Sequence, residues 1–132
     1  MREIKFRGKR IDTGEWIFGD LLQDGDLSFI VGRLKEFMDT PVNECLVKPD
    51  TVGQYTGLKD RNGKEIYEGD IIGGSNGSIN GYPWPFTLLI KWNDAACGFN
   101  TPKWGYMDST HYYEVIGNIH DNPELLEDWD NE

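Results

Sequence analysis

The stretch QYTGLKDRNGKEIYEGDII at 54–72 limits what this chain can fold into more than any other segment. Its first residues favour a pleated strand, and Asn62-Gly63 supplies the two positive-φ positions that a tight type I′ hairpin turn requires. Residues 65–68 then return as a strand that Gly69-Asp70 ends, and Ile71-Ile72 are apolar enough to enter a core. The stretch therefore predicts a β-hairpin followed by a buried strand.

The segments before this stretch predict further short strands. An opening hairpin is expected over 4–22, with the turn signal Asp12-Thr13-Gly14 between its strands. A second turn at 23–26 precedes a third strand at 27–31. Residues 33–39 have apolar residues at helical spacing but stop before a proline, which predicts a loop or one helical turn.

The segments after the central stretch predict strands separated by a long connection. Strands are expected at 86–92 and 112–116, and the connection 73–85 is rich in Gly, Ser and Asn. This order is similar, at the level of fold, to a small SH3-like barrel. Asn122-Pro123-Glu124 then favours the start of a short helix in the acidic tail.

Length and composition favour one folded, β-rich domain. A chain of 132 residues can bury a core without metal or disulfide support, and 13% aromatic residues with sixteen glycines suit short strands and tight turns. We therefore expect a mainly β protein of the β-rich α+β type, in which an N-terminal β-hairpin region packs on a small SH3-like β-barrel. The expected parts are sub-lobes at 1–52 and 53–120 and a short helical tail at 121–132.

The formal charge of −10 is unevenly distributed. The first ten residues carry a net +4, which leaves −14 for the rest of the chain, and the basic side chains are Arg2, Lys5, Arg7, Lys9 and Arg10. We interpret them as the solvent face of a strand that meets acidic groups elsewhere on the protein. Net acidity opposes loose association with phosphate backbones.

The cysteines and the hydropathy pattern indicate a reducing, aqueous compartment. Cys45 and Cys97 stand apart with no CxxC spacing, and the opening residues MREIKFRGKR lack the apolar core of a signal peptide. No segment approaches the roughly 18 apolar residues that a membrane helix needs. We expect a cytoplasmic protein that does not enter a membrane.

Three blocks of the sequence resemble the YopX family of bacteriophage and prophage proteins: REIKFRGKRIDTGEWIFGDLL at 2–22, TVGQYTGLKDRNGKEIYEGDII at 51–72 and EVIGNIHDNPELL at 114–126. The resemblance implies a phage or prophage origin, a compact β-rich protein in a bacterial host, and no established activity. The family has no agreed catalytic residues, so none transfers to this chain. Residues 23–50 and 73–113 match no pattern of the family.

Residues that could carry metal or nucleophilic chemistry are scarce. His111 and His120 are the only histidines, and they show no zinc-ligand spacing with the two cysteines. The segment GGSNGS at 73–78 lacks the lysine of a phosphate-binding loop, and two histidines leave little material for a triad. We expect no metal, no cofactor and no nucleotide hydrolysis.

Carboxylates in the central stretch are the only candidates for acid–base catalysis. Asp60, Glu65, Glu68 and Asp70 could bring two carboxylates together across the hairpin, as a hydrolase would require. Asp70 lies between a glycine and an apolar pair, which favours the acceptance of backbone hydrogen bonds at a tight bend. An enzyme is therefore the least favoured of three hypotheses.

Aromatic residues in Pro- and Gly-rich loops are the candidate binding residues, and they are Tyr82, Trp84, Trp104 and Tyr106. Exposed Trp and Tyr often anchor binding surfaces. The alternative is that these loops fold back over a small core. Phe86 and Trp92 flank an apolar run and are predicted to be packing residues.

The favoured hypothesis is a non-enzymatic module that binds an unknown host or phage protein, with self-association into a homo-oligomer as a subsidiary form. The alternative is nucleic-acid binding, in which Arg2, Lys5, Arg7, Lys9 and Arg10 contact phosphates while loop aromatics stack on unpaired bases. A further variant is an acidic protein that imitates the charge of DNA and occupies a DNA-binding enzyme of the host.

Overall fold

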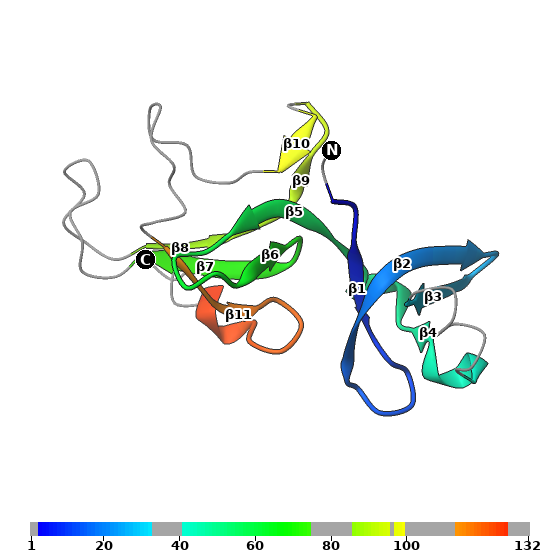
Figure 1. The fold of residues 1–132 in the computed structure, drawn as a ribbon. Coiled ribbons are helices and arrows are strands. Elements are labelled where there is room, and N and C mark those ends of the chain that lie inside the picture. The colour runs from blue at the N-terminus through cyan, green and yellow to red at the C-terminus, as the bar shows by residue number, and fades with distance from the viewer. Residues whose placement is uncertain (1–2, 33–40, 75–85, 96, 100–112, 127–132) are drawn as a thin grey trace. The chain divides into compact units, whose positions relative to one another are not determined.

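The computed structural model describes residues 3–32, 41–74, 86–95, 97–99 and 113–126, and it shows a mainly β protein (Figure 1). This confirms the expected fold class. The chain divides into two compact units, residues 1–55 and residues 56–132. None of the helices within the described ranges is long and apolar enough to cross a membrane.

The first unit is built on a meander of antiparallel strands. Its elements are β1 (Phe6–Lys9), β2 (Trp16–Asp24), β3 (Leu27–Val31), the 3₁₀ helix η1 (Val42–Glu44), β4 (Leu46–Val47), the 3₁₀ helix η2 (Pro49–Thr51) and the start of β5 (Gly53–Lys59). The strand order of the sheet is β4-β3-β2-β1-β5-β6, and its last strand, β6 (Glu65–Tyr67), belongs to the second unit. The predicted opening hairpin and third strand are confirmed, whereas the prediction for 33–39 lies outside the described residues.

Strands β1 to β4 close on themselves around a small core. Arg10, which follows β1, forms a β-bridge with Val47 of β4, and the Lys48 N–H donates to the Lys9 carbonyl at 2.9 Å. The closure depends on Gly8, because a Cβ there would lie 2.9 Å from Val47 Cγ2. Val47 is fully buried, and the other buried apolar side chains described in this unit are Ile30, Cys45 and Tyr55.

The loop between β5 and β6 (Glu65–Tyr67) differs from the predicted turn. Gly63 has a φ of +84°, but Asn62 is not among the described residues with positive φ, so the type I′ prediction is wrong. Asp60 closes a longer loop instead: its carbonyl accepts the Gly63 N–H, and its Oδ1 accepts the N–H groups of Asn62 and Lys64, each at 2.9 Å. Because the carboxylate satisfies two loop amides, a two-residue turn is not needed.

Besides β6 and the end of β5, the described residues of the second unit form two further sheets. The strands β11 (Glu114–Asn118), β7 (Asp70–Gly74) and β8 (Phe86–Leu89) form one sheet in that order, and β9 (Trp92–Asn93) pairs with β10 (Gly98–Phe99). Buried Ile66, Ile72, Ile90 and Tyr113 form the core, so the predicted entry of Ile71-Ile72 into a core is confirmed. Residues 124–126 are helical, as expected of a short C-terminal helix. The SH3-like barrel stays a prediction.

Candidate functional site

The register of the first unit places the side chains of its strands on two opposite faces. Arg7 lies opposite Phe18 and Leu22 lies opposite Phe29, and directly opposed residues of antiparallel strands share a face. Ile30, which is in the core, points to the other side. We define the outer face as the side of the first unit that carries Lys5, Arg7, Lys9, Trp16, Phe18, Asp20, Leu22, Asp24, Leu27, Phe29 and Val31.

Basic side chains at the N-terminal end of the outer face lie over aromatic rings. The Arg7 guanidinium carbon is 4.5 Å from the centre of the Trp16 ring, and Lys9 Nζ is 5.6 Å from the same ring. Lys5 Nζ is 5.7 Å from the centre of the Tyr55 ring and 3.2 Å from the Glu3 carboxylate. Each cation–π contact stabilises the fold by roughly 0.5–1 kcal/mol at exposed sites and by more when desolvated.

Arg7 departs from the predicted solvent-facing row of basic residues, because it is only 6% exposed. Its partner on β5 is Gly53, which has no side chain, so space is left beside the strand for the guanidinium. Trp16 covers the guanidinium from the β2 side. For Arg7 the prediction of a solvated position is therefore wrong, and the reason is the pairing of β1 with two particular neighbours.

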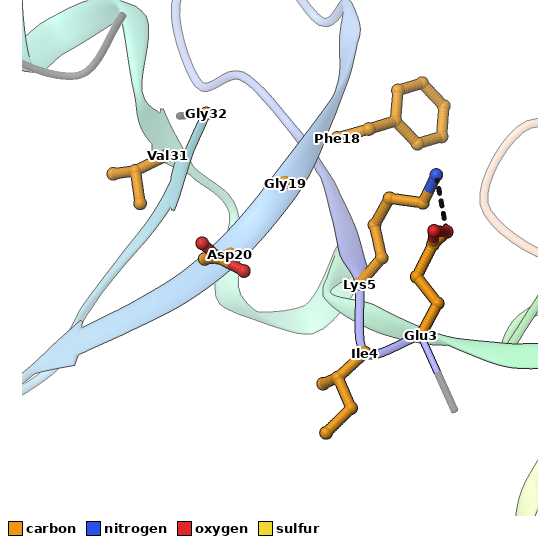
Figure 2. Close-up of a pocket in the computed structure, with 8 residues that line it drawn as sticks. All are labelled: Glu3, Ile4, Lys5, Phe18, Gly19, Asp20, Val31 and Gly32. Carbon is orange, nitrogen blue, oxygen red and sulfur yellow. Dashed lines mark ion pairs between the residues drawn. The ribbon is translucent and has the colours of Figure 1, made fainter. Parts of the chain in front are cut away.

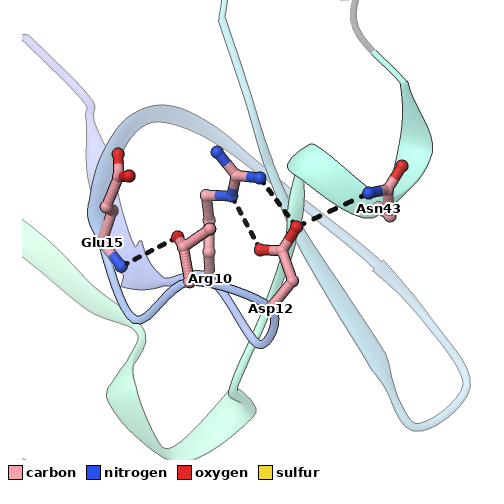
Figure 3. Close-up of polar contacts among 5 residues, drawn as sticks. Arg10, Asp12, Glu15 and Asn43 are labelled. Carbon is pink, nitrogen blue, oxygen red and sulfur yellow. Dashed lines mark hydrogen bonds and ion pairs between the residues drawn. The ribbon is translucent and has the colours of Figure 1, made fainter.

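Arg10 is held by the turn that follows it (Figure 3). Its Nε and Nη2 donate to the two carboxylate oxygens of Asp12 at 2.9 and 2.7 Å, and Asn43 Nδ2 donates to the same carboxylate at 3.5 Å. The hydrogen bond from Arg10 lowers the pKa of Asp12 below the ordinary range of an aspartate, and the same hydrogen bond raises the pKa of Arg10.

The Asp12 carboxyl should therefore titrate at a lower pH than an ordinary aspartate. Because its pKa is lower when folded, the ion pair stabilises the fold above about pH 4, and this contribution is lost as pH falls through the folded pKa. Side-chain NMR of the Arg10→Gln variant should show the Asp12 pKa rising towards its ordinary range. Arg61→Gln, which removes a pair with Glu114 in the other unit, should leave it unchanged. Identical Asp12 titrations in the Arg10→Gln variant and the wild type would contradict the assignment.

These contacts bear on the nucleic-acid alternative. Lys5, Arg7 and Lys9 lie over aromatic rings and Arg10 binds Asp12, so a phosphate would have to compete with groups of the same chain. Arg2 lies outside the described residues. The geometry gives no support to a row of basic side chains held ready for phosphates, and the alternative stays a prediction.

A groove opens beside β2, close to the point where β1 and β2 separate (Figure 2). Its volume is about 390 Å³, and it is lined by Glu3, Ile4, Lys5, Phe18, Gly19, Asp20, Val31 and Gly32. In Figure 2, Lys5 and Glu3 extend towards each other on the side to which Phe18 also projects, and Ile4 points away from them. The groove thus combines apolar surface with the carboxylates of Glu3 and Asp20 and the ammonium of Lys5, which is paired with Glu3.

The hairpin of β2 and β3 exposes large apolar side chains next to this groove. Phe18 is 51% exposed, and Leu22 and Leu27 are each 48% exposed. Their exposure was not predicted from the sequence. The available signal was that β2 is apolar on both faces, since Trp16, Phe18 and Leu22 alternate with Ile17 and Leu21. That pattern indicates a strand with apolar side chains on both faces. If one face packs into the core of its own unit, the other face needs a different contact to be covered.

The carboxylates of the central stretch serve the fold. Asp60 is 5% exposed, and its Oδ2 accepts the Val115 N–H at 2.9 Å in addition to the two loop amides at Oδ1. Asp70 Oδ2 accepts the Tyr67 N–H at 2.8 Å, which confirms the predicted backbone contact at a tight bend. Glu65 Oε1 accepts the Tyr67 hydroxyl at 3.0 Å, and Glu68 is partly buried.

With the fold and this geometry established, the chain can be compared with known proteins. The model of the YopX family, described as YopX protein, matches residues 5–127. The chain belongs to the YopX family. The crystal structure of protein EF1440 from Enterococcus faecalis is similar to this YopX protein, with a TM-score of 0.59 and 26% identity over 96% of this chain and 99% of that one. A search of curated proteins finds no match.

The loop aromatics Tyr82, Trp84, Trp104 and Tyr106 of this YopX protein lie outside the described residues, so their role as binding residues stays a prediction. Phe86 is the first residue of β8, but its side chain is not among those that the structure describes, so its predicted packing role stays a prediction. Trp92 was expected to be a packing residue and is instead exposed. It contacts Phe99 edge to face at 5.2 Å, because β9 and β10 form a separate small ribbon.

The two histidines and the two cysteines are the residues that were considered as metal ligands. His111 is outside the described residues, and His120 is partly buried in the turn after β11. Cys45 is buried and Cys97 is exposed, and both thiols are free. Within the described part of the chain, no three or more His, Cys, Asp or Glu residues are grouped so that they could hold a metal ion.

The two thiols of this YopX protein should differ strongly in reactivity. Burial raises the pKa of the Cys45 thiol, so the reactive thiolate is scarce as well as inaccessible. Cys97 is exposed in the turn between β9 and β10. A chromogenic disulfide reagent at pH 8 should label one thiol quickly, identified as Cys97 by peptide mapping, and the second only on unfolding. Equal rates for both thiols in the native protein would contradict the burial of Cys45.

Proposed function

We propose that this YopX family member is a non-enzymatic protein-binding module that uses the outer face of its first unit. The observation that carries the proposal is the exposure of Phe18, Leu22 and Leu27 on one β-hairpin, each at about half of its surface. Single exposed apolar residues are common, but neighbouring ones on a regular element are typical of an interaction surface. Leu22 pairs with Phe29, and Leu27 pairs with Asp24. Leu22 and Leu27 are therefore diagonal neighbours on the same face of the hairpin.

The non-enzymatic part of the proposal is supported by the roles of the acidic residues. Asp60 and Asp70 are two of the four carboxylates considered for acid–base catalysis, and their oxygens accept backbone N–H groups within tight loops. A carboxylate held in this way is committed to the fold, whereas a catalytic acid or base must reach a substrate. The outer face offers apolar contact area and carboxylates, which suits binding better than turnover.

The proposed partner is a protein of the bacterial host or of the phage, met in the cytoplasm. A second copy of the chain is the subsidiary partner. Light scattering over a concentration series tests it, and a monomer throughout would remove it. In a further variant of the proposal the partner is a DNA-binding protein, because a net charge of −10 would let this protein imitate the charge of DNA. Competition between this protein and duplex DNA for the captured partner would distinguish that variant.

The test is capture from a nuclease-treated bacterial lysate by the tagged wild type and by two variants. The wild type should retain one host protein in near-stoichiometric amount, and Leu22→Ser/Leu27→Ser should reduce its recovery about tenfold, because the apolar contact area is lost. Ile116→Ser is the matched control, since Ile116 is 40% exposed in the other unit, and it should retain the partner.

Two results would contradict the proposal. One is that nothing is retained after nuclease treatment although untreated lysate leaves nucleic acid bound. The other is that the double variant retains the same proteins in the same amounts as the wild type. Circular dichroism of each variant, compared with the wild type, establishes that a lost partner reflects the surface and not the fold.

A further inference from the structure

The part of β2 beyond Gly19 is an edge in the described sheet. The pairing of β1 with β2 ends at Phe6 opposite Gly19, whereas β2 continues to Asp24. The chain before β1 turns to β5 instead, because the Tyr55 N–H donates to the Lys5 carbonyl at 2.8 Å. Among the described strands, this end of β2 pairs with β3 alone. Such an edge is a template for an added strand.

The surface along this edge is both apolar and acidic. Leu22 and Leu27 lie on the outer face with Asp24, and Asp20 lines the groove with Ile4. The segment 15–32 contains Glu15, Asp20, Asp24 and Asp26 but no Lys or Arg. The hairpin thus presents apolar contact area between carboxylates of one sign, and its electrostatic complement is a basic partner.

The same carboxylates argue against a second copy at this edge. If two β2 edges paired in antiparallel fashion about Leu22, Asp20 of one chain would lie opposite Asp24 of the other. Like charges directly opposite each other destabilise a strand pair, and charged edges are a common means of preventing self-pairing. A strand with basic residues at alternate positions would instead place cations opposite Asp20 and Asp24.

We infer that the edge of β2 from Asp20 to Asp24 binds an extended segment of a partner protein in which basic and apolar residues alternate. The segment adds to the sheet beside β2, its basic side chains face Asp20 and Asp24, and its neighbouring chain enters the groove next to Ile4 and Phe18. The inference deepens the proposed protein-binding function and rests on it.

The test uses synthetic heptapeptides with blocked ends. The probe is Lys-Val-Lys-Val-Lys-Val-Lys, and its matched controls are the same peptide with Glu in place of Lys and the Lys peptide with N-methyl groups on alternate backbone nitrogens. Calorimetry should show binding of the Lys peptide to the whole protein. The acidic peptide and the N-methylated peptide should each bind at least about tenfold more weakly, because charge pairing or strand hydrogen bonds are lost.

Two further readouts locate the site. Amide exchange should slow at residues 20–24 when the Lys peptide binds. The Asp20→Asn/Asp24→Asn variant should bind it about tenfold more weakly, with a difference that shrinks as salt is added. Asp50→Asn/Asp94→Asn removes two exposed carboxylates elsewhere and should bind as the wild type does.

Equal affinity for the Lys and Glu peptides, unchanged affinity in the Asp20/Asp24 variant, or protection away from residues 20–24 would overturn the inference. Its failure is distinguishable from failure of the proposed function. If lysate capture depends on Leu22 and Leu27 while the Lys peptide does not bind at β2, the protein-binding function stands and the strand-addition mode is wrong. If capture also fails, the function itself is wrong.

Discussion

Asp60→Ala is expected to destabilise the protein by about 4 kcal/mol, because one buried carboxylate satisfies three backbone N–H groups. Each hydrogen bond to a charged acceptor is worth roughly 1.5–3 kcal/mol, and the total is less than their sum because the amides of exposed Asn62 and Lys64 can bind water. The Val115 amide is less accessible, so its loss contributes most. Urea unfolding followed by circular dichroism measures the change.

Asp60→Asn should destabilise the protein less than Asp60→Ala does. The amide keeps an oxygen for the loop N–H groups of Asn62 and Lys64, but its NH₂ faces the Val115 N–H, so two donors meet where a donor and an acceptor met. We expect an intermediate loss of about 2 kcal/mol and faster amide exchange at Val115 than in the wild type. Asp94→Ala removes an exposed carboxylate and should change stability by less than about 0.5 kcal/mol. If Asp60→Ala and Asp94→Ala are equally stable, Asp60 does not join its loop to β11.

Gly19→Ala should be the most damaging of the glycine-to-alanine substitutions for which an added Cβ can be placed in the first unit. A Cβ at this position would lie 2.1 Å from the backbone carbonyl oxygen of Val31, and no side-chain rotation can relieve that contact. The strands β2 and β3 would have to separate locally. Such overpacking costs about 3 kcal/mol, which lowers the melting temperature by on the order of 10 °C for a chain of this size. Thermal unfolding followed by tryptophan fluorescence measures it.

Gly25→Ala is the matched control in the same hairpin. Gly25 has a φ of +60° at the tip between β2 and β3, but a Cβ there would meet nothing within 4 Å. Only the backbone preference is lost, so the expected cost is about 1 kcal/mol. A Gly19→Ala protein that melts within a few degrees of the Gly25→Ala protein would show that β2 and β3 do not approach as closely as described.

The strands and turns of this protein could be predicted from local sequence because their causes are local. The turn at Asp12-Thr13-Gly14 and the third strand at Leu27–Val31 follow from turn residues and β-branched residues a few positions apart. The loop at Asn62-Gly63 could not be predicted in the same way. Its geometry depends on Asp60, which also binds Val115, and the pairing of these two residues is invisible in a local window.

The outer face shows a similar limit. Alternating basic residues predict a solvated row, but Arg7 is buried because the register places Gly53 on one side of it and Trp16 covers it from the other. In β2 the sequence shows apolar residues on both faces, and only the closure of β1 to β4 decides that Leu22 remains exposed. Which face of a strand is covered is a property of the whole sheet, so the proposed interaction surface could be found only from the fold.

Site-specific photo-cross-linking in bacteria that express the protein tests most directly the proposal that the outer face binds a protein. A benzophenone amino acid in place of Leu22 reports on the outer face, and the same group in place of exposed Lys64 reports on the second unit. We expect a discrete, nuclease-resistant protein adduct from position 22 and none from position 64. Equal adducts from both positions, or an adduct at position 22 that nuclease removes, would contradict it.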